Sequence, residues 1–247
     1  HGDQEIFDYE EIIEKFDLAS VNRSEGALDL QKMEWVNQQH IQKCDGARLA
    51  ELVLPFLSRE GVAVAPDDPR LRPAVETMRA RAKTLVEMAQ NMKFYFIADE
   101  GLPLDGDAVA KFFTDTTCPL LHQMADVLTA VGEWKEEAIS AAVHGFIEST
   151  GLKLKDVAQP ARTALVGRAA GPGLYETMAV LGRESTLARL RRAALRPGPG
   201  MLAINDDRTE RAGSYLGLYV ALKGDNYFPG DIDLIGLEDR AGFAVRF

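Results

Sequence analysis

Helical spacing of apolar residues dominates this sequence as far as residue 196. Apolar side chains recur three and four residues apart in one segment after another, which predicts amphipathic helices. No segment of useful length before residue 196 shows the alternation of apolar and polar residues that predicts a strand. We therefore predict an all-α fold for this part of the chain. The predicted helices are 9–16, 30–43, 47–59, 74–96, 108–114, 119–131, 135–149, 154–166, 174–181 and 184–195.

Local signals refine two of these helices. Asp29 and Asp45 each stand just before a predicted helix, where a short side-chain oxygen can accept a hydrogen bond from the first backbone N–H groups. Pro55 falls inside the helix 47–59, where its ring removes one hydrogen bond and crowds the preceding turn. We expect N-caps at the two aspartates, and a kink or a break into two pieces at Pro55.

The best domain boundary is the segment 98–107, which combines two glycines, a proline and four acidic residues. It divides the helical part into two predicted domains, 1–97 and 98–196. Residues 197–247 differ in composition, and the linker RPGPG (196–200) leads into them. Three short strands are predicted in this tail, at 214–222, 231–237 and 241–247, and its role is left open.

Charge is unevenly distributed along the chain. The 247 residues carry a formal net charge of −10, yet segment 153–196 holds nine basic and three acidic residues, a local net charge of +6. A second basic cluster lies at 70–83. Segregated basic charge is typical of a surface that binds a polyanion, because neutralising phosphates releases counterions. A solvated helix face with scattered ion pairs is the alternative that charge alone leaves open.

Motifs for catalysis are missing from the sequence. It contains no phosphate-binding glycine loop, no nucleophile elbow, no CxxC and no pair of histidines at metal-binding spacing. The carboxylates at 105–107 are interpreted as helix caps rather than metal ligands, and no metal site is predicted. No apolar run approaches the roughly 20 residues that cross a bilayer, so we expect a cytoplasmic protein without membrane contact. Structural roles are predicted for the four histidines, His1, His40, His122 and His144.

Four segments, in order and at compatible spacing, carry a resemblance to a known family. They are HGDQEIF (1–7), VNRSEGALDLQKMEWVNQQHI (21–41), RARAKTL (79–85) and GLKLKDVAQPARTALVGRAAGPGLYETMAVLGRE (151–184). Residues 1 to about 196 resemble the anticodon-binding C-terminal half of bacterial glutamyl-tRNA synthetase, a class I aminoacyl-tRNA synthetase. The resemblance implies two consecutive helical bundles that form a superhelix and hold the anticodon loop of tRNA-Glu.

The resemblance also implies roles for individual residues. Arg81 matches the arginine that reads the third anticodon base, and Arg162 matches one that contacts the first. Pro172, Gly173 and Leu174 match a loop against which anticodon bases pack. Weaker contacts with the RNA backbone are expected from Arg79, Lys83 and Arg168. The remaining arginines near the end of the last helix, Arg189, Arg191 and Arg192, are interpreted as a solvated helix end whose dipole favours positive charge.

The resemblance places catalysis outside this sequence. The HIGH and KMSKS signatures of class I synthetases are absent, so the ATP, magnesium and glutamate sites are expected N-terminal to His1. No cofactor and no ligase activity are expected of this chain alone, and a monomer is expected. Two alternatives stay open: a helical adaptor that binds RNA or a protein partner, the latter through an apolar patch at Leu216, Tyr219 and Val220, and an inert product of a truncated gene.

Overall fold

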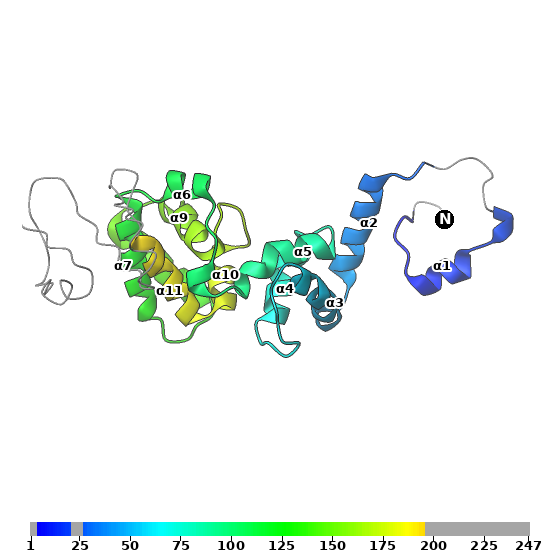
Figure 1. The fold of residues 1–247 in the computed structure, drawn as a ribbon, viewed down its shortest axis with the longest axis horizontal. Coiled ribbons are helices and arrows are strands. Elements are labelled where there is room, and N and C mark those ends of the chain that lie inside the picture. The colour runs from blue at the N-terminus through cyan, green and yellow to red at the C-terminus, as the bar shows by residue number, and fades with distance from the viewer. Residues whose placement is uncertain (1–3, 21–26, 196–247) are drawn as a thin grey trace, which may run out of the picture. The chain divides into compact units, whose positions relative to one another are not determined.

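The structure is a computed structural model that describes residues 4–20 and 27–195. All regular structure in these ranges is helical, which confirms the all-α prediction there (Figure 1). The predicted strands at 214–222, 231–237 and 241–247 lie outside the described residues. The α-helices are α1 (Tyr9–Lys15), α2 (Leu30–Lys43), α3 (Gly46–Arg59), α4 (Leu71–Arg79), α5 (Leu85–Met92), α6 (Gly106–Phe112), α7 (Thr117–Thr129), α8 (Glu136–Thr150), α9 (Leu154–Val166), α10 (Leu174–Leu181) and α11 (Arg183–Ala194). The 3-10 helices are η1 (Leu18–Ser20), η2 (Lys93–Tyr95) and η3 (Asp99–Gly101).

Both predicted N-caps are confirmed. The Asp29 carboxylate accepts backbone N–H groups at the start of α2 at 2.9 and 3.1 Å, and Asp45 does the same for α3 at 2.9 and 3.1 Å. α3 continues through Pro55 as one helix, so the segment does not break into two pieces there, and a kink at Pro55 stays a prediction. Pro55 lies on the exposed side of α3, where its ring meets solvent rather than core packing.

The helix predicted over 74–96 is interrupted in the structure. α4 ends at residue 79 and α5 begins at residue 85, with a turn between them. Thr84 caps α5 by accepting the backbone N–H of Glu87 at 3.1 Å, and the Glu87 carboxylate accepts the backbone N–H of Lys83 at 2.9 Å. The turn therefore has its own capping contacts, and it carries Arg81 on a loop rather than on a helix.

The helices of the described residues fall into two groups, and the helices within each group pack against one another. α3, α4 and α5 contact one another, and α6 to α11 form the second group around α7, α9 and α11 (Figure 1). The groups meet where α4 contacts α10 and where η3 contacts α11. Buried apolar side chains from both groups join in one core. The boundary predicted at residue 98 thus falls within a packed junction, and the division into two domains there stays a prediction.

Candidate nucleic-acid interface

Arg81 projects from the turn between α4 and α5. Its side chain is exposed and makes no hydrogen bond or ion pair with any other residue in the described part of the chain. Its backbone N–H donates to the Met78 carbonyl oxygen at 2.9 Å, which fixes the turn itself. The backbone that carries this side chain is therefore fixed, and the guanidinium donors are available.

Arg162 lies on α9 and is half-buried. Its Nε is buried and has no hydrogen-bond partner among the described residues, and the buried Oε1 of Gln159, one turn earlier, also has none. Burial lowers the pKa of Arg162, and the charge of Arg81 lowers this pKa further. Arg81 therefore lies near enough for its charge to act on Arg162, although the two residues come from different helix groups.

This arrangement is suited to an anionic or hydrogen-bond-accepting ligand. Two like charges repel, and a buried polar group without a partner costs free energy, so the pair is unfavourable for folding. No carboxylate of a described residue pairs with either guanidinium. A ligand that accepts hydrogen bonds from both arginines would satisfy them.

Tyr95 lies within reach of the Arg81 charge, and sequence reasoning missed it. It is fully buried, its hydroxyl donates to Thr77 Oγ1 at 3.2 Å, and burial raises its pKa to about 12. The nearby Arg81 charge acts in the opposite direction and lowers that pKa. In the sequence Tyr95 stands in the aromatic run 94–96, which is typical of a core and gives no signal of an adjoining site.

The predicted base-packing loop, residues 172–174, leads into α10. Pro172 is buried and Leu174 is only 7% exposed, so both apolar side chains pack inward. Gly173 is half-buried, and its backbone N–H donates to the Glu176 carboxylate at 3.2 Å. Both the apolar side chains of this turn and the N–H of its glycine therefore have partners within the chain.

Arg79 is placed differently from the other predicted site residues. Its Nε and Nη2 donate to the two carboxylate oxygens of Glu76, both at 2.7 Å. Its Nη1 donates to the backbone carbonyls of Gln42, at 3.1 Å, and of Cys44, at the C-terminal end of α2. The guanidinium is occupied in joining α4 to α2.

Lys83 and Arg168 also have partners within the chain. Lys83 forms an exposed ion pair with Glu34 at 3.1 Å, which leaves its ammonium accessible to solvent. Arg168 is half-buried, and its Nη2 donates to the side-chain oxygen of Asn91 at 2.8 Å, which ties the end of α9 to the end of α5.

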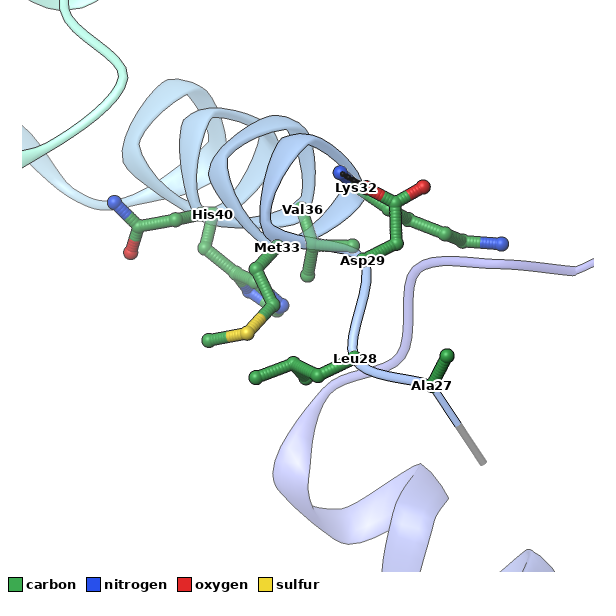
Figure 2. Close-up of a pocket in the computed structure, with 8 residues that line it drawn as sticks. Ala27, Leu28, Asp29, Lys32, Met33, Val36 and His40 are labelled. Atoms are coloured by element: carbon green, nitrogen blue, oxygen red, sulfur yellow. Dashed lines mark hydrogen bonds between the residues drawn. The ribbon is translucent and has the colours of Figure 1, made fainter. Parts of the chain in front are cut away.

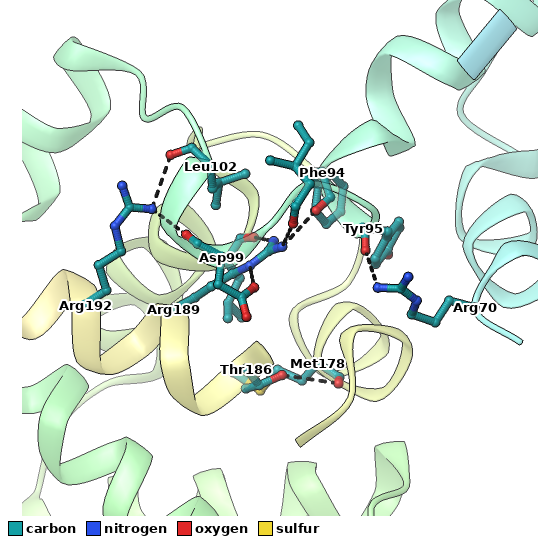
Figure 3. Close-up of polar contacts among 11 residues, drawn as sticks. Arg70, Phe94, Tyr95, Asp99, Leu102, Met178, Thr186, Arg189 and Arg192 are labelled. Carbon is teal, nitrogen blue, oxygen red and sulfur yellow. Dashed lines mark hydrogen bonds and ion pairs between the residues drawn. The ribbon is translucent and has the colours of Figure 1, made fainter. Parts of the chain in front are cut away.

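The prediction of a solvated end for α11 is wrong for two of its three arginines. Arg189 is 2% exposed and pairs with Asp99 at 2.6 Å (Figure 3). Arg192 donates from Nη1 to the backbone carbonyl of Asp99 at 2.5 Å. Arg191 is exposed, as predicted. The physical reason is that carbonyls and a carboxylate from 94–99 lie against α11 and accept the arginine donors.

A separate hollow of about 410 Å³ lies at the start of α2 (Figure 2). Its lining is largely apolar, with Leu28, Met33 and Val36 among the labelled side chains. The lysine in this lining, Lys32, is paired with Glu5 at 2.8 Å. The lining also contains Asp29, so the hollow carries no excess of positive charge of the kind that the Arg81–Arg162 pair offers.

The chain is similar to known proteins over most of its described length. A family model described as "Anticodon binding domain" matches residues 48–194. The chain belongs to this family. Among curated relatives, the glutamate–tRNA ligase of Nitratidesulfovibrio vulgaris strain Hildenborough is 42% identical over 193 residues, covering 78% of this chain and 41% of the relative. The glutamate–tRNA ligase of Geobacter sulfurreducens is 38% identical over 193 residues, with the same coverage of 78% and 41%.

Solved structures show the same similarity. The glutamate–tRNA ligase of Elizabethkingia meningosepticum superposes with a TM-score of 0.65 at 27% identity, over 75% of this chain and 36% of that one. The glutamate–tRNA synthetase of Elizabethkingia anophelis gives a TM-score of 0.62 at 26% identity, over 76% and 36%. The resemblance read from the sequence is thereby confirmed, and this member of the family spans about two-fifths of the length of the curated relatives, 41%. In the described ranges, no helix is both long and apolar enough to span a bilayer.

Proposed function

We propose that this chain binds the anticodon loop of tRNA-Glu as the anticodon-binding part of a glutamate–tRNA ligase. One observation carries the proposal: the Arg81 charge acts on the half-buried Arg162, and no described acidic residue pairs with either, in a chain of net charge −10. In so acidic a chain, two neighbouring cations without a carboxylate partner are an arrangement that a polyanionic ligand explains. Membership of the anticodon-binding family supports the same ligand.

Each arginine has a proposed part in reading the loop. The Arg81 guanidinium, exposed on a fixed turn, would donate to the edge of the third anticodon base, and Arg162 would contact the first. A planar guanidinium presents several donors in fixed directions, so a base with the wrong edge leaves donors unsatisfied. Such a contact discriminates between bases by about 1–3 kcal/mol. Splayed, single-stranded bases are the targets that such contacts suit.

The remaining predicted contacts divide according to their partners. The turn at 172–174 would lie against a splayed base, as the family resemblance implies. Lys83 and Arg168 would supply phosphate contacts, Lys83 by exchanging its exposed partner Glu34 for a phosphate. Arg79 is left out of the proposed surface, because its guanidinium already binds Glu76 and the carbonyls at the end of α2.

The ligase reaction itself is proposed for the longer protein. The joining of glutamate to tRNA, with its ATP and magnesium, would be carried out by segments of the relatives that this chain does not span. We propose no catalytic step for the residues of this chain. A cytoplasmic location and a monomeric state are part of the same proposal.

The experiment uses the full chain and a fluorescently labelled anticodon stem-loop of tRNA-Glu. Anisotropy titrations compare this stem-loop with loops changed only at the third anticodon base. We expect the changed loops to bind at least about tenfold more weakly. A tenfold loss of affinity lies toward the lower end of what such base contacts give. The control variant is Arg191→Met, which replaces an exposed arginine on α11. We expect it to keep the preference for the correct third base. Equal affinity for all loops would overturn the proposed reading of the third base.

The helical-adaptor alternative has one observation in its favour. α1 carries no buried residue, and its apolar side chains Tyr9, Ile12 and Ile13 are 77%, 50% and 62% exposed. Exposed apolar side chains of this kind are typical of a protein contact. The patch predicted at Leu216, Tyr219 and Val220 lies outside the described residues. A chain that bound no stem-loop at low salt would favour the adaptor.

A further inference from the structure

The buried Arg189 joins three segments that are distant in the sequence. From α11 its Nε donates to the Asp99 carboxylate at 2.6 Å, and its Nη1 donates to the Leu165 carbonyl at 2.7 Å. Its Nη2 donates to the carbonyls of Phe94, at 3.0 Å, and Ile97, at 2.9 Å. Figure 3 shows the Arg189 guanidinium beside two of these partners, Asp99 and Phe94. One side chain thus links α11, the last turn of α9 and the segment 94–99.

Two of these segments are continuous with the elements that carry the proposed base-reading arginines. Leu165 lies on α9 three residues after Arg162, less than one turn further along the same helix. Phe94 lies in η2, which follows α5 directly, and α5 follows the turn that holds Arg81. Arg189 therefore binds the last turn of α9, in one helix group, and the segment that follows α5, in the other.

The contacts explain why arginine occupies this position. Burial lowers the pKa of Arg189, while the ion pair with Asp99 opposes that effect, so the charge is kept inside the protein by its partners. The guanidinium uses donors on all three nitrogens at fixed angles. A lysine carries its donors on a single flexible ammonium and cannot reach acceptors in three directions in this way.

Neighbouring contacts reinforce the junction. Arg192 donates to the carbonyl of Asp99 at 2.5 Å, and Arg168 donates to Asn91 at the end of α5 at 2.8 Å. The backbone N–H of Asp105 donates to the carbonyl of Gly167 at 2.7 Å. The acidic segment 98–107 is therefore bound along its length to the second helix group.

We propose that Arg189 is a positioning residue that sets the spacing between Arg81 and Arg162. The Arg189 guanidinium fixes the end of α9 against the segment that follows α5, and so holds the two proposed base-reading arginines close together. Loss of this side chain would let the two helix groups change their relative position. The consequence for RNA binding rests on the proposed function, whereas the spacing itself does not.

The first test measures the spacing without RNA. Spin labels are placed at the exposed positions 86 on α5 and 155 on α9 by Val86→Cys and Lys155→Cys, in a chain that also carries Cys44→Ser and Cys118→Ala. Pulsed electron paramagnetic resonance then gives the distance distribution. We expect one narrow distribution in this background and with Arg191→Met, and a broadened or shifted one with Arg189→Met. An unchanged distribution in a folded Arg189→Met chain would overturn the proposal.

Circular dichroism at the measuring temperature ensures that only folded chains are compared. Where Arg189→Met fails to fold, Arg189→Lys keeps the charge and loses the three-way donation, and it takes the place of Arg189→Met with the same expected and contradicting results.

The second test measures RNA binding in the same variants. We expect the folded Arg189 variant to bind the tRNA-Glu stem-loop on the order of tenfold more weakly than Arg191→Met. A merely structural role would lower the unfolding temperature and leave the affinity of the folded chain and the third-base preference unchanged. That outcome would overturn the positioning role in binding. Failure of the unmodified chain to bind the stem-loop would instead count against the proposed function, and the label distances would still decide the role of Arg189.

Discussion

The Arg81–Arg162 pair and the junction around Arg189 use the same residue type in opposite ways. At the junction, the donors of the buried Arg189 meet a carboxylate and three carbonyls, so the charge stabilises the contact between segments. At the pair, the charge of Arg81 acts on Arg162, and the buried Arg162 Nε has no partner among the described residues. The comparison shows that local partners, rather than the amount of basic charge, separate arginines that hold the fold from arginines available to a ligand.

The largest effect is expected from Arg189→Met. Removal of one member of a buried ion pair leaves Asp99 and the carbonyls of Phe94 and Leu165 without their donor. Such a loss costs about 3–5 kcal/mol in the free energy of unfolding. Urea denaturation followed by circular dichroism measures it. Arg191→Met on the same helix serves as the control, with an expected change within about 0.5 kcal/mol. Equal stability of the two variants would contradict the distinction between buried and solvated arginines.

A smaller loss of stability is expected from Arg79→Met. This arginine caps the end of α2 and pairs with Glu76, but its side chain is 21% exposed, so solvent replaces part of what is lost. We expect the free energy of unfolding to fall by about 1–3 kcal/mol. The stem-loop affinity of the folded chain should change by less than about twofold, or less than about 0.5 kcal/mol, because Arg79 is not part of the proposed RNA surface. A large loss of affinity with unchanged stability would return Arg79 to the proposed RNA surface.

Arg81→Gln should show the opposite pattern. The Arg81 side chain has no partner among the described residues, so its replacement should change the free energy of unfolding by less than about 0.5 kcal/mol. The preference for the correct third anticodon base should fall by about 1–3 kcal/mol. Competition titrations with loops that differ at this base alone measure the preference. An Arg81→Gln chain with full discrimination would assign the third base to another residue.

Much of the helical fold could be predicted, because helix periodicity and capping are local in the sequence. Asp29 and Asp45 cap the helices that were predicted to follow them. The break between α4 and α5 could not be predicted in the same way. Helix α2, which is distant in the sequence, contacts this turn. Asn37 donates to the carbonyl of Lys83, and Gln38 donates to that of Ala80. Tertiary contacts of this kind override helical periodicity.

The site was predictable residue by residue but not as an arrangement. Arg81 and Arg162 were identified through the resemblance, while their proximity depends on how the two helix groups pack. The prediction of a solvated Arg189 fails because its partner Asp99 lies 90 residues away in the sequence. Its other partners are backbone carbonyls, which carry no formal charge and leave no signal in the sequence. Basic residues in an acidic chain therefore need their partners identified before they can be assigned to a ligand.

The most direct test of this account uses Arg162→Met, measured for stability and for RNA binding in the same preparation. Arg162 is half-buried, its Nε has no described partner, and both burial and the Arg81 charge lower its pKa. Its replacement should therefore leave the free energy of unfolding unchanged or raise it, while stem-loop affinity falls by about tenfold, or about 1.4 kcal/mol. A chain that lost stability and kept full affinity would show that Arg162 serves the fold, and would contradict the account.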